Sequence, residues 1–66
     1  MEIPNKLKDM RTKKGLTQEE LSQKANVSRV IIVGLENGTI DVVRTSTLTK
    51  LAKALNYKVR DIFFIC

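Results

Sequence analysis

The chain has 66 residues, with twelve Lys and Arg against seven Asp and Glu, a net charge of +5 and a pI near 9.7. A domain of this size has a small core, which leaves little room for a two-layer enzyme cleft and makes self-association favourable. The positive charge favours an anionic partner, either nucleic acid or an acidic membrane surface, although it can also serve solubility alone.

The residue types and segments that the sequence lacks exclude further classes of protein. The chain has no His, and its one Cys, Cys66, is the last residue, which excludes an intrachain disulfide and argues against metal and thiol–imidazole sites. The opening MEIPNKLKDMRTKK lacks the apolar region of a signal peptide, and no window approaches the roughly 18 apolar residues of a membrane span. We expect a soluble, cytoplasmic protein with a reduced thiol, forming a single domain over residues 1–66.

Helical spacing predicts five helices in chain order, and the first lies near the N-terminus. Leu7, Met10 and Lys14 share one face of this segment. Asn5 is suited to the N-cap position, and Gly15 is suited to stop the helix.

The second helix begins at LTQEEL. Thr17 and Glu20 have the spacing of a capping box, and Leu16 and Leu21 have the spacing of a hydrophobic staple. The helix ends before Asn26, a residue type that tolerates the left-handed conformation of a tight turn.

The stretch NVSRVIIVGLENG gives conflicting signals. Residues 30–33 are four consecutive β-branched residues, which favour a strand. Ser28 can cap a helix, however, Val27 and Ile32 can form a staple, and Gly38 can end the helix. Because intrinsic propensity is a weak determinant that tertiary context overrides, the boundary signals predict a third helix.

A loop over residues 38–44 precedes a fourth helix at about 45–56, and a short fifth helix is expected at about 59–64. The fourth helix has one apolar face, formed by Leu48, Leu51, Ala52 and Leu55. Two helices joined by a tight turn in a small basic all-α domain have helix-turn-helix organisation, here over about residues 17–37. The alternative is a five-helix bundle without a ligand.

The segments LKDMRTKKGLTQEELSQKANVSRVIIVGLENG and TLTKLAKALNYKVRDIF resemble the phage-repressor (Xre/Cro-like) helix-turn-helix domains. The shared features are an Arg near the end of the first helix, LTQEEL, the V-S entry to the third helix, LENG at its end, and LAKAL. The resemblance implies an all-α, compact five-helix domain with the lambda-repressor-like DNA-binding fold. Its third helix would lie in the major groove, and homodimers would bind palindromic operators with half-sites about 34 Å apart. It also implies an ion pair between Arg11 and Glu36.

Nine residues are predicted to contact DNA, and they are Gln18, Ser28, Arg29, Val30, Val33, Gly34, Asn37, Thr39 and Arg44. Gln18 begins the second helix, where free N–H groups favour a phosphate. Ser28 can cap its own helix or offer its hydroxyl, and Arg29 suits guanine O6 and N7 or a phosphate. Asn37, Thr39 and Arg44 surround a loop that follows the phosphate backbone in the family, although GTIDVVRTS is a residue or two longer and lacks the usual proline.

The outward face of the third helix departs from the family, because positions that often carry polar base-reading residues are mostly apolar here. This outward set consists of Val30, Val33, Gly34 and Asn37. Three explanations stay open. The valines pack on thymine C5-methyl groups while Gly34 permits close approach; the face binds a protein; or neighbouring helices bury Ile31 and Val33 and the face is smaller.

The C-terminal RDIFFIC is more apolar than a free end should be. We expect a homodimer that buries Val42, Val43, Phe64 and Ile65. The alternatives are burial within the chain, or a short terminal β-ribbon in which Phe64 and Ile65 pair with residues 1–3.

These features predict a sequence-specific, DNA-binding transcriptional regulator, most simply a bacterial or phage repressor that binds double-stranded DNA at a palindromic operator. An enzyme is disfavoured, since the sequence has no paired carboxylates on one helix face and no phosphate-cradling glycine loop. No cofactor or metal is predicted. The alternative is a DNA-binding antitoxin or a protein-binding adaptor, with a toxin or another protein as partner.

Overall fold

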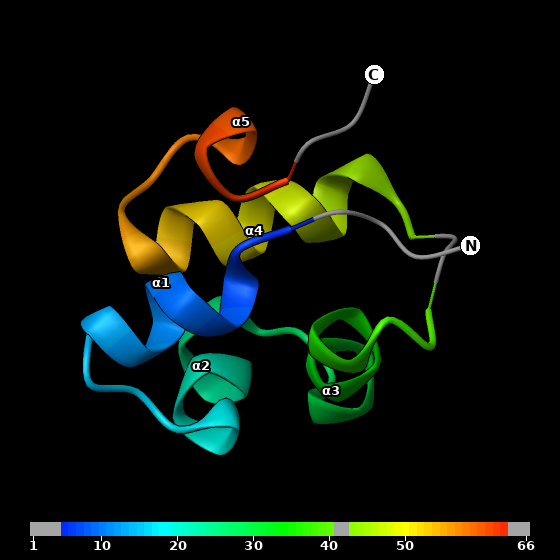
Figure 1. Cartoon of the computed structure of the whole chain (residues 1–66), viewed down its shortest axis with the longest axis horizontal. Coiled ribbons are helices and arrows are strands. Elements are labelled where there is room, and N and C mark those ends of the chain that lie inside the picture. The colour runs from blue at the N-terminus through cyan, green and yellow to red at the C-terminus, as the bar shows by residue number, and fades with distance from the viewer. Residues whose placement is uncertain (1–4, 41–42, 64–66) are drawn as a thin grey trace.

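Five helices form the fold in the computed structural model, which describes residues 5–40 and 43–63 (Figure 1). They are α1 (Leu7–Lys13), α2 (Gln18–Ala25), α3 (Arg29–Asn37), α4 (Thr45–Leu55) and α5 (Val59–Ile62). The predicted all-α class and the five helices are confirmed. None of the helices described is long and apolar enough to span a membrane.

The helix boundaries follow the predicted caps, except at the start of α1. Asn5 Oδ1 accepts a hydrogen bond from the backbone N–H of Leu7 at 3.0 Å, but the N-cap position of α1 is Lys6, one residue later than expected. Thr17 Oγ1 accepts from the N–H of Glu20, and the Glu20 carboxylate accepts from the N–H of Thr17. The second hydrogen bond lowers the pKa of Glu20. Asn26 is left-handed, with φ of 55°, and therefore ends α2 as expected.

The β-branched run belongs to a helix, as its flanking residues predicted. Ser28 Oγ accepts from the N–H of Val30 at 3.2 Å, and Gly38 ends α3 with φ of 76°. Val27 and Ile32 are buried at the positions of the predicted staple. Strand propensity in this segment is overridden because Ile32 and Leu35 enter the core from one helical face.

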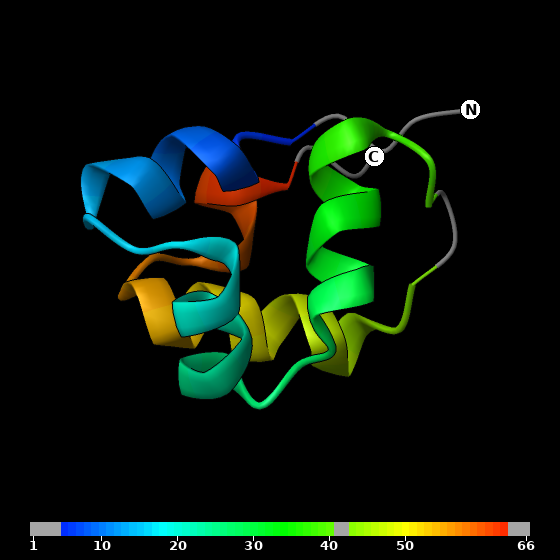
Figure 2. The ribbon, with the colours of Figure 1, turned by 90° about the horizontal axis from the view of Figure 1, so that it is seen from below.

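A single core fills the space between the helices. α2 packs against both α3 and α4, α1 packs against α3, and α5 packs against α4 (Figure 2). The buried apolar residues are Leu7, Leu21, Ala25, Val27, Ile32, Leu35, Leu48, Leu51, Ala52, Leu55, Ile62 and Phe63. They include the whole predicted apolar face of α4.

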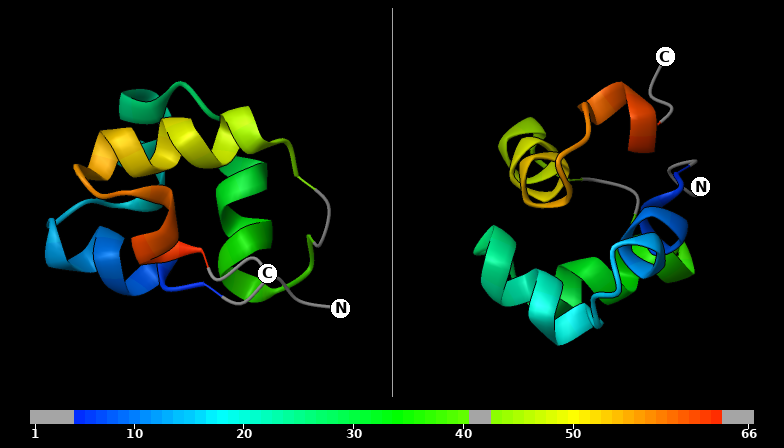
Figure 3. Two further views of the ribbon diagram at one scale, coloured as in Figure 1. Left: turned by 90° about the horizontal axis from the view of Figure 1, so that it is seen from above. Right: turned by 90° about the vertical axis from the view of Figure 1, so that its left-hand side faces the viewer.

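The two ends of the described chain lie side by side (Figure 3). Asn5 and Phe63 form an isolated antiparallel bridge, and the backbone N–H of Lys6 donates to the carbonyl of Ile62 at 2.8 Å. α5 therefore ends at Ile62, earlier than predicted, because Phe63 is extended. The predicted ribbon between residues 1–3 and 64–65 lies outside the described residues.

Candidate nucleic-acid interface

The carboxylate of Glu36 on α3 receives hydrogen bonds from two other helices. Arg11 of α1 donates from Nε to Oε2 at 2.7 Å and from Nη2 to Oε1 at 3.0 Å. Gln18 of α2 donates from Nε2 to Oε1 at 3.1 Å. The third donor group of Arg11, Nη1, reaches the carbonyl of Leu16 at 2.7 Å. The predicted ion pair is therefore present, and it joins α1 and α3 and extends to α2.

Burial makes this pair sensitive to disruption. The side chains of Arg11 and Glu36 are only 10% and 2% exposed. Hydrogen bonding to Glu36 raises the pKa of Arg11, and two-point contact of this kind is stronger than a single hydrogen bond between neutral groups. Within residues 5–40 and 43–63, no buried side-chain nitrogen or oxygen lacks a hydrogen-bond partner. The network holds α3 at a fixed rotation about its axis.

Gln18 belongs to this network. The sequence predicted that Gln18 contacts a phosphate, but it did not predict this hydrogen bond to Glu36. Its side chain is half-buried, and one N–H of the amide is directed to Glu36. An amide nitrogen carries two N–H donors, so a second donor remains for a phosphate. Gln18 thus has a positioning role in the folded chain whatever it contacts on DNA.

Three consecutive residues at the start of α3 present their side chains to solvent. Ser28 and Arg29 are exposed, and Val30 is 74% exposed, the highest value among large apolar residues in the described chain. Val33 is half-buried, and Ile31 packs against the edge of the core. The structure therefore exposes apolar side chains on the outward face of α3, although Ile31 is not one of them.

Gly34 is buried, so its predicted place on an open outward face is wrong. The backbone N–H groups of Thr39 and Ile40 both donate to the carbonyl of Gly34, at 2.9 Å and 3.2 Å, and bring the loop back against α3. A Cβ at position 34 would overlap the end of the Ile40 side chain and would lie 3.2 Å from its Cβ. The missing side chain at Gly34 therefore lets the loop lie close against α3.

Side chains of α3 and of this loop surround an open hollow of about 420 Å³. Its lining residues are Arg29, Val30, Val33, Gly34, Thr39 and Ile40. Five of them are among the nine predicted site residues, and we call this feature the α3 hollow. Ile40 was not among the predicted site residues. The sequence signal that could have indicated it is an isolated isoleucine two residues after Gly38, the glycine that ends α3.

The remaining predicted residues lie around this face or outside the described chain. Asn37 is exposed at the end of α3, and Arg44 is exposed at the N-cap position of α4. Neither residue lines the α3 hollow. Val43, expected in a dimer surface, is half-buried and packs in part against the chain's own core. The other three residues of that surface, Val42, Phe64 and Ile65, lie outside the described residues.

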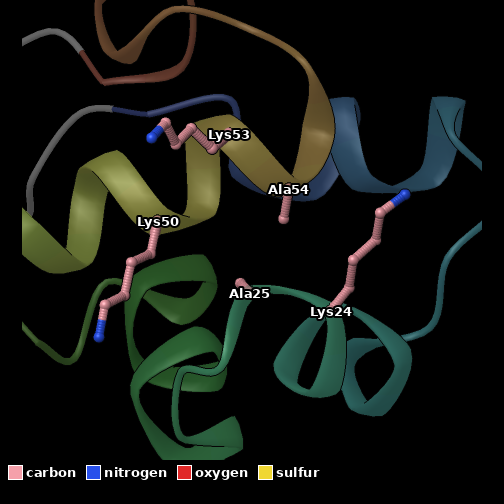
Figure 4. A pocket seen from close by; sticks show the side chains of 5 residues that line it. All are labelled: Lys24, Ala25, Lys50, Lys53 and Ala54. Carbon is pink, nitrogen blue, oxygen red and sulfur yellow. The ribbon is translucent and has the colours of Figure 1, made fainter.

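A second hollow of about 330 Å³ lies between α2 and α4 (Figure 4). Ala25 and Ala54 line it together with Lys24, Lys50 and Lys53. The three lysine side chains extend in different directions rather than toward one point (Figure 4). This basic hollow therefore adds positive charge to the surface without forming a converging set of ligands.

Comparison with known proteins agrees with this geometry. A family model described as helix-turn-helix matches residues 7–62. An uncharacterized HTH-type transcriptional regulator of Methanocaldococcus jannaschii is 42% identical over 61 residues, which are 92% of this chain and 91% of the relative. The uncharacterized HTH-type transcriptional regulator YgzD of Bacillus subtilis is 34% identical over 64 residues, 96% of this chain and 94% of YgzD.

A solved structure is also similar. The restriction-modification controller protein C.AhdI from Aeromonas hydrophila matches with a TM-score of 0.77 and 36% sequence identity. The match covers 83% of this chain and 82% of the controller protein.

Replacing Arg11 should destabilise the fold strongly, because the Glu36 carboxylate would be left buried without its cation. We expect Arg11→Met to lower the free energy of unfolding by about 3–5 kcal/mol, measured by urea denaturation. Arg11→Lys, which keeps the charge and loses the planar fork, should fall between Arg11→Met and the parent. The matched change at an exposed arginine, Arg29→Met, should cost less than about 0.5 kcal/mol. Equal losses at the two arginines would contradict the role given to Glu36.

The contact between Gly34 and Ile40 predicts a change of sign. Gly34→Ala should destabilise the parent, because overpacking costs about 1–3 kcal/mol and the gain in helix propensity is only about 1 kcal/mol. In an Ile40→Ala background the overlap is largely removed, so the same Gly34→Ala change should stabilise the protein. Urea denaturation of the four proteins measures both effects. The same effect of Gly34→Ala in both backgrounds would show that Ile40 does not cover this glycine.

Proposed function

The chain belongs to the helix-turn-helix family of the phage-repressor (Xre/Cro-like) type, and from that premise we propose that it represses transcription as a homodimer on a palindromic operator. It is a DNA-binding transcriptional regulator, since its regulator relatives match over nearly their whole length. On this proposal it works in the cytoplasm, where the DNA is, and catalyses no reaction.

One observation carries the proposal. The inner side of α3 is fixed by the Glu36 network and by burial of Ile32 and Leu35, while Arg29 and Val30 on its first turn remain exposed. A helix held rigidly from behind, with its first turn free, suits entry of its N-terminal end into the major groove. Rigid support is what allows a short side chain to distinguish one base edge from another.

The polar groups of this face divide between backbone and base contacts. Ser28 Oγ accepts from the N–H of Val30, which leaves the hydroxyl proton free to donate to a phosphate oxygen. Gln18 has a second N–H for the same purpose. Arg29 is exposed at the start of α3 and suits guanine O6 and N7. Arg44 is exposed at the start of α4 and suits a further phosphate. The exposed Thr39 hydroxyl donates to the Gly34 carbonyl at 3.5 Å and would exchange that bond for one to a phosphate. The net charge of +5 attracts DNA at longer range.

The homodimer follows from the operator geometry and from the size of the chain. Two copies would place their α3 helices in half-sites about 34 Å apart, and a dimer of that span covers a promoter well enough to block transcription. A domain of 66 residues also gains stability from burying surface against a second copy. The dimer surface is proposed near Val43, with Val42, Phe64 and Ile65.

The exposed apolar face gives one alternative some support. Val30 and the α3 hollow form the kind of surface that also binds proteins, as in an antitoxin or an adaptor. Under that function a protein partner would cover the α3 hollow, and DNA selection would yield no motif that depends on α3.

Selection of binding sites from random duplexes tests the proposed function. We expect an enriched inverted repeat with half-sites about 10 base pairs apart. If the dimer makes six to ten phosphate contacts, affinity should fall roughly 10³–10⁵-fold between 50 and 200 mM salt. Arg29→Ala should weaken binding to the selected site by about 1–3 kcal/mol, because it loses a base or phosphate contact.

Arg60→Ala provides the matched control, since Arg60 is also exposed but lies on α5. This variant should bind almost as the parent does. Failure to enrich any motif would overturn a sequence-specific function, and equal effects of the two arginine variants on a selected site would contradict the role given to Arg29.

A further inference from the structure

The α3 hollow has an apolar centre on a face that the proposed function turns toward DNA. Val30 and Val33 from α3 and Ile40 from the loop contribute hydrocarbon, and Arg29 and Thr39 contribute polar groups. None of the three apolar side chains can donate or accept a hydrogen bond. The centre of the hollow can therefore interact favourably only with an apolar group of its partner.

The loop side of the hollow is held in place by specific contacts. Two backbone hydrogen bonds to the Gly34 carbonyl fix Thr39 and Ile40 against α3. The absence of a side chain at Gly34 lets Ile40 lie directly on the helix. Ile40 is also packed against the core, which restricts its movement. The hollow is thus formed before any ligand arrives, and ordering it on binding costs little free energy.

The major groove of DNA offers one apolar group to such a surface. Thymine carries a methyl group at C5 beside its O4 acceptor, whereas the major-groove edges of guanine, adenine and unmodified cytosine carry hydrogen-bond donors and acceptors and no methyl group. A polar edge pressed against Val33 and Ile40 would lose its water without gaining a partner, which is unfavourable. The hollow therefore favours thymine and disfavours the other bases at the same position.

Resting on the proposed function, we propose that the α3 hollow binds the C5-methyl group of a thymine in each operator half-site. Val30, Val33 and Ile40 are then specificity-determining residues, and Ile40 acts from outside the recognition helix. Arg29, on the first turn of α3, contacts a neighbouring guanine or phosphate and sets the register of the helix along the groove.

Replacement of single thymines by deoxyuracil in the selected operator tests this directly, because the change removes only the methyl group. Each half-site should contain one thymine that is sensitive to this change. Its substitution in a single half-site should weaken binding about fourfold, equivalent to about 0.8 kcal/mol for one buried methyl group. Substitution in both half-sites should weaken binding roughly fifteenfold, since the two losses add in free energy. Affinity is measured by fluorescence anisotropy with labelled duplexes.

A second pair of duplexes separates the methyl group from the rest of the base. At the same position, 5-methylcytosine paired with guanine should bind about fourfold more tightly than unmodified cytosine. The methyl group is the only difference within each pair, so the ratio of thymine to uracil should equal the ratio of 5-methylcytosine to cytosine. A preference confined to thymine over uracil would overturn recognition of the methyl group itself.

Protein variants connect the effect to the hollow. Val30→Ala and Val33→Ala should each reduce the ratio of thymine to uracil affinity toward one. Val30 is mostly exposed, so Val30→Ala should fold normally. Ile40→Val, which shortens the loop-side wall by one carbon, should reduce the ratio by less. Val59→Ala, at a half-buried valine on α5, is the control and should preserve the ratio.

The outcomes distinguish this inference from the function on which it rests. If the protein selects a motif in which no uracil substitution weakens binding, the methyl site is wrong and the DNA-binding function stands. The methyl site is also wrong, and the function again stands, if the ratio is unchanged in Val30→Ala, Val33→Ala and Ile40→Val. If no motif is selected at all, both proposals fail, and a protein partner becomes the occupant of the hollow.

Discussion

The Glu36 carboxylate is the constraint on which the arrangement of the first three helices depends. It is almost fully buried, so its charge requires partners, and it obtains them from Arg11 on α1 and Gln18 on α2. Arg11 also binds the Leu16 carbonyl, just before α2 begins, and Asn5 donates to the Leu35 carbonyl beside Glu36. These contacts fix both the position of α3 and its rotation, and consequently they decide which residues of α3 face outward.

The outward side of α3 is unusual because it is apolar. A surface helix ordinarily buries an apolar stripe and exposes polar residues. Here a polar network lies on the inner side at Glu36, and Val30 and Val33 lie on the outer side. Ile40 extends this surface from the loop and covers the one glycine within α3. Apolar surface of this kind usually marks a binding site, and on a DNA-binding helix thymine methyl groups are its natural partner.

Local signals in the sequence were sufficient for the helices and for part of the site. Capping residues such as Thr17 and Ser28 act on neighbouring N–H groups, so their effect is visible without tertiary structure. The resemblance supplied the pair of Arg11 and Glu36. A helical wheel, however, treats α3 as an isolated cylinder, and it could not show that the loop folds back to bury Gly34 beneath Ile40. The bond from Gln18 to Glu36 was missed for the same reason, because it depends on how two helices pack.

The central claim is that this rigidly supported apolar face meets the operator. The most direct measurement is a methyl NMR titration of the protein with the selected duplex, observing valine, isoleucine and alanine methyl groups together. The account predicts the largest chemical-shift changes at Val30, Val33 and Ile40, with Ala25 and Ala54 at the basic hollow nearly unchanged. Changes centred on Ala25 and Ala54, with Val30 and Val33 unaffected, would contradict it.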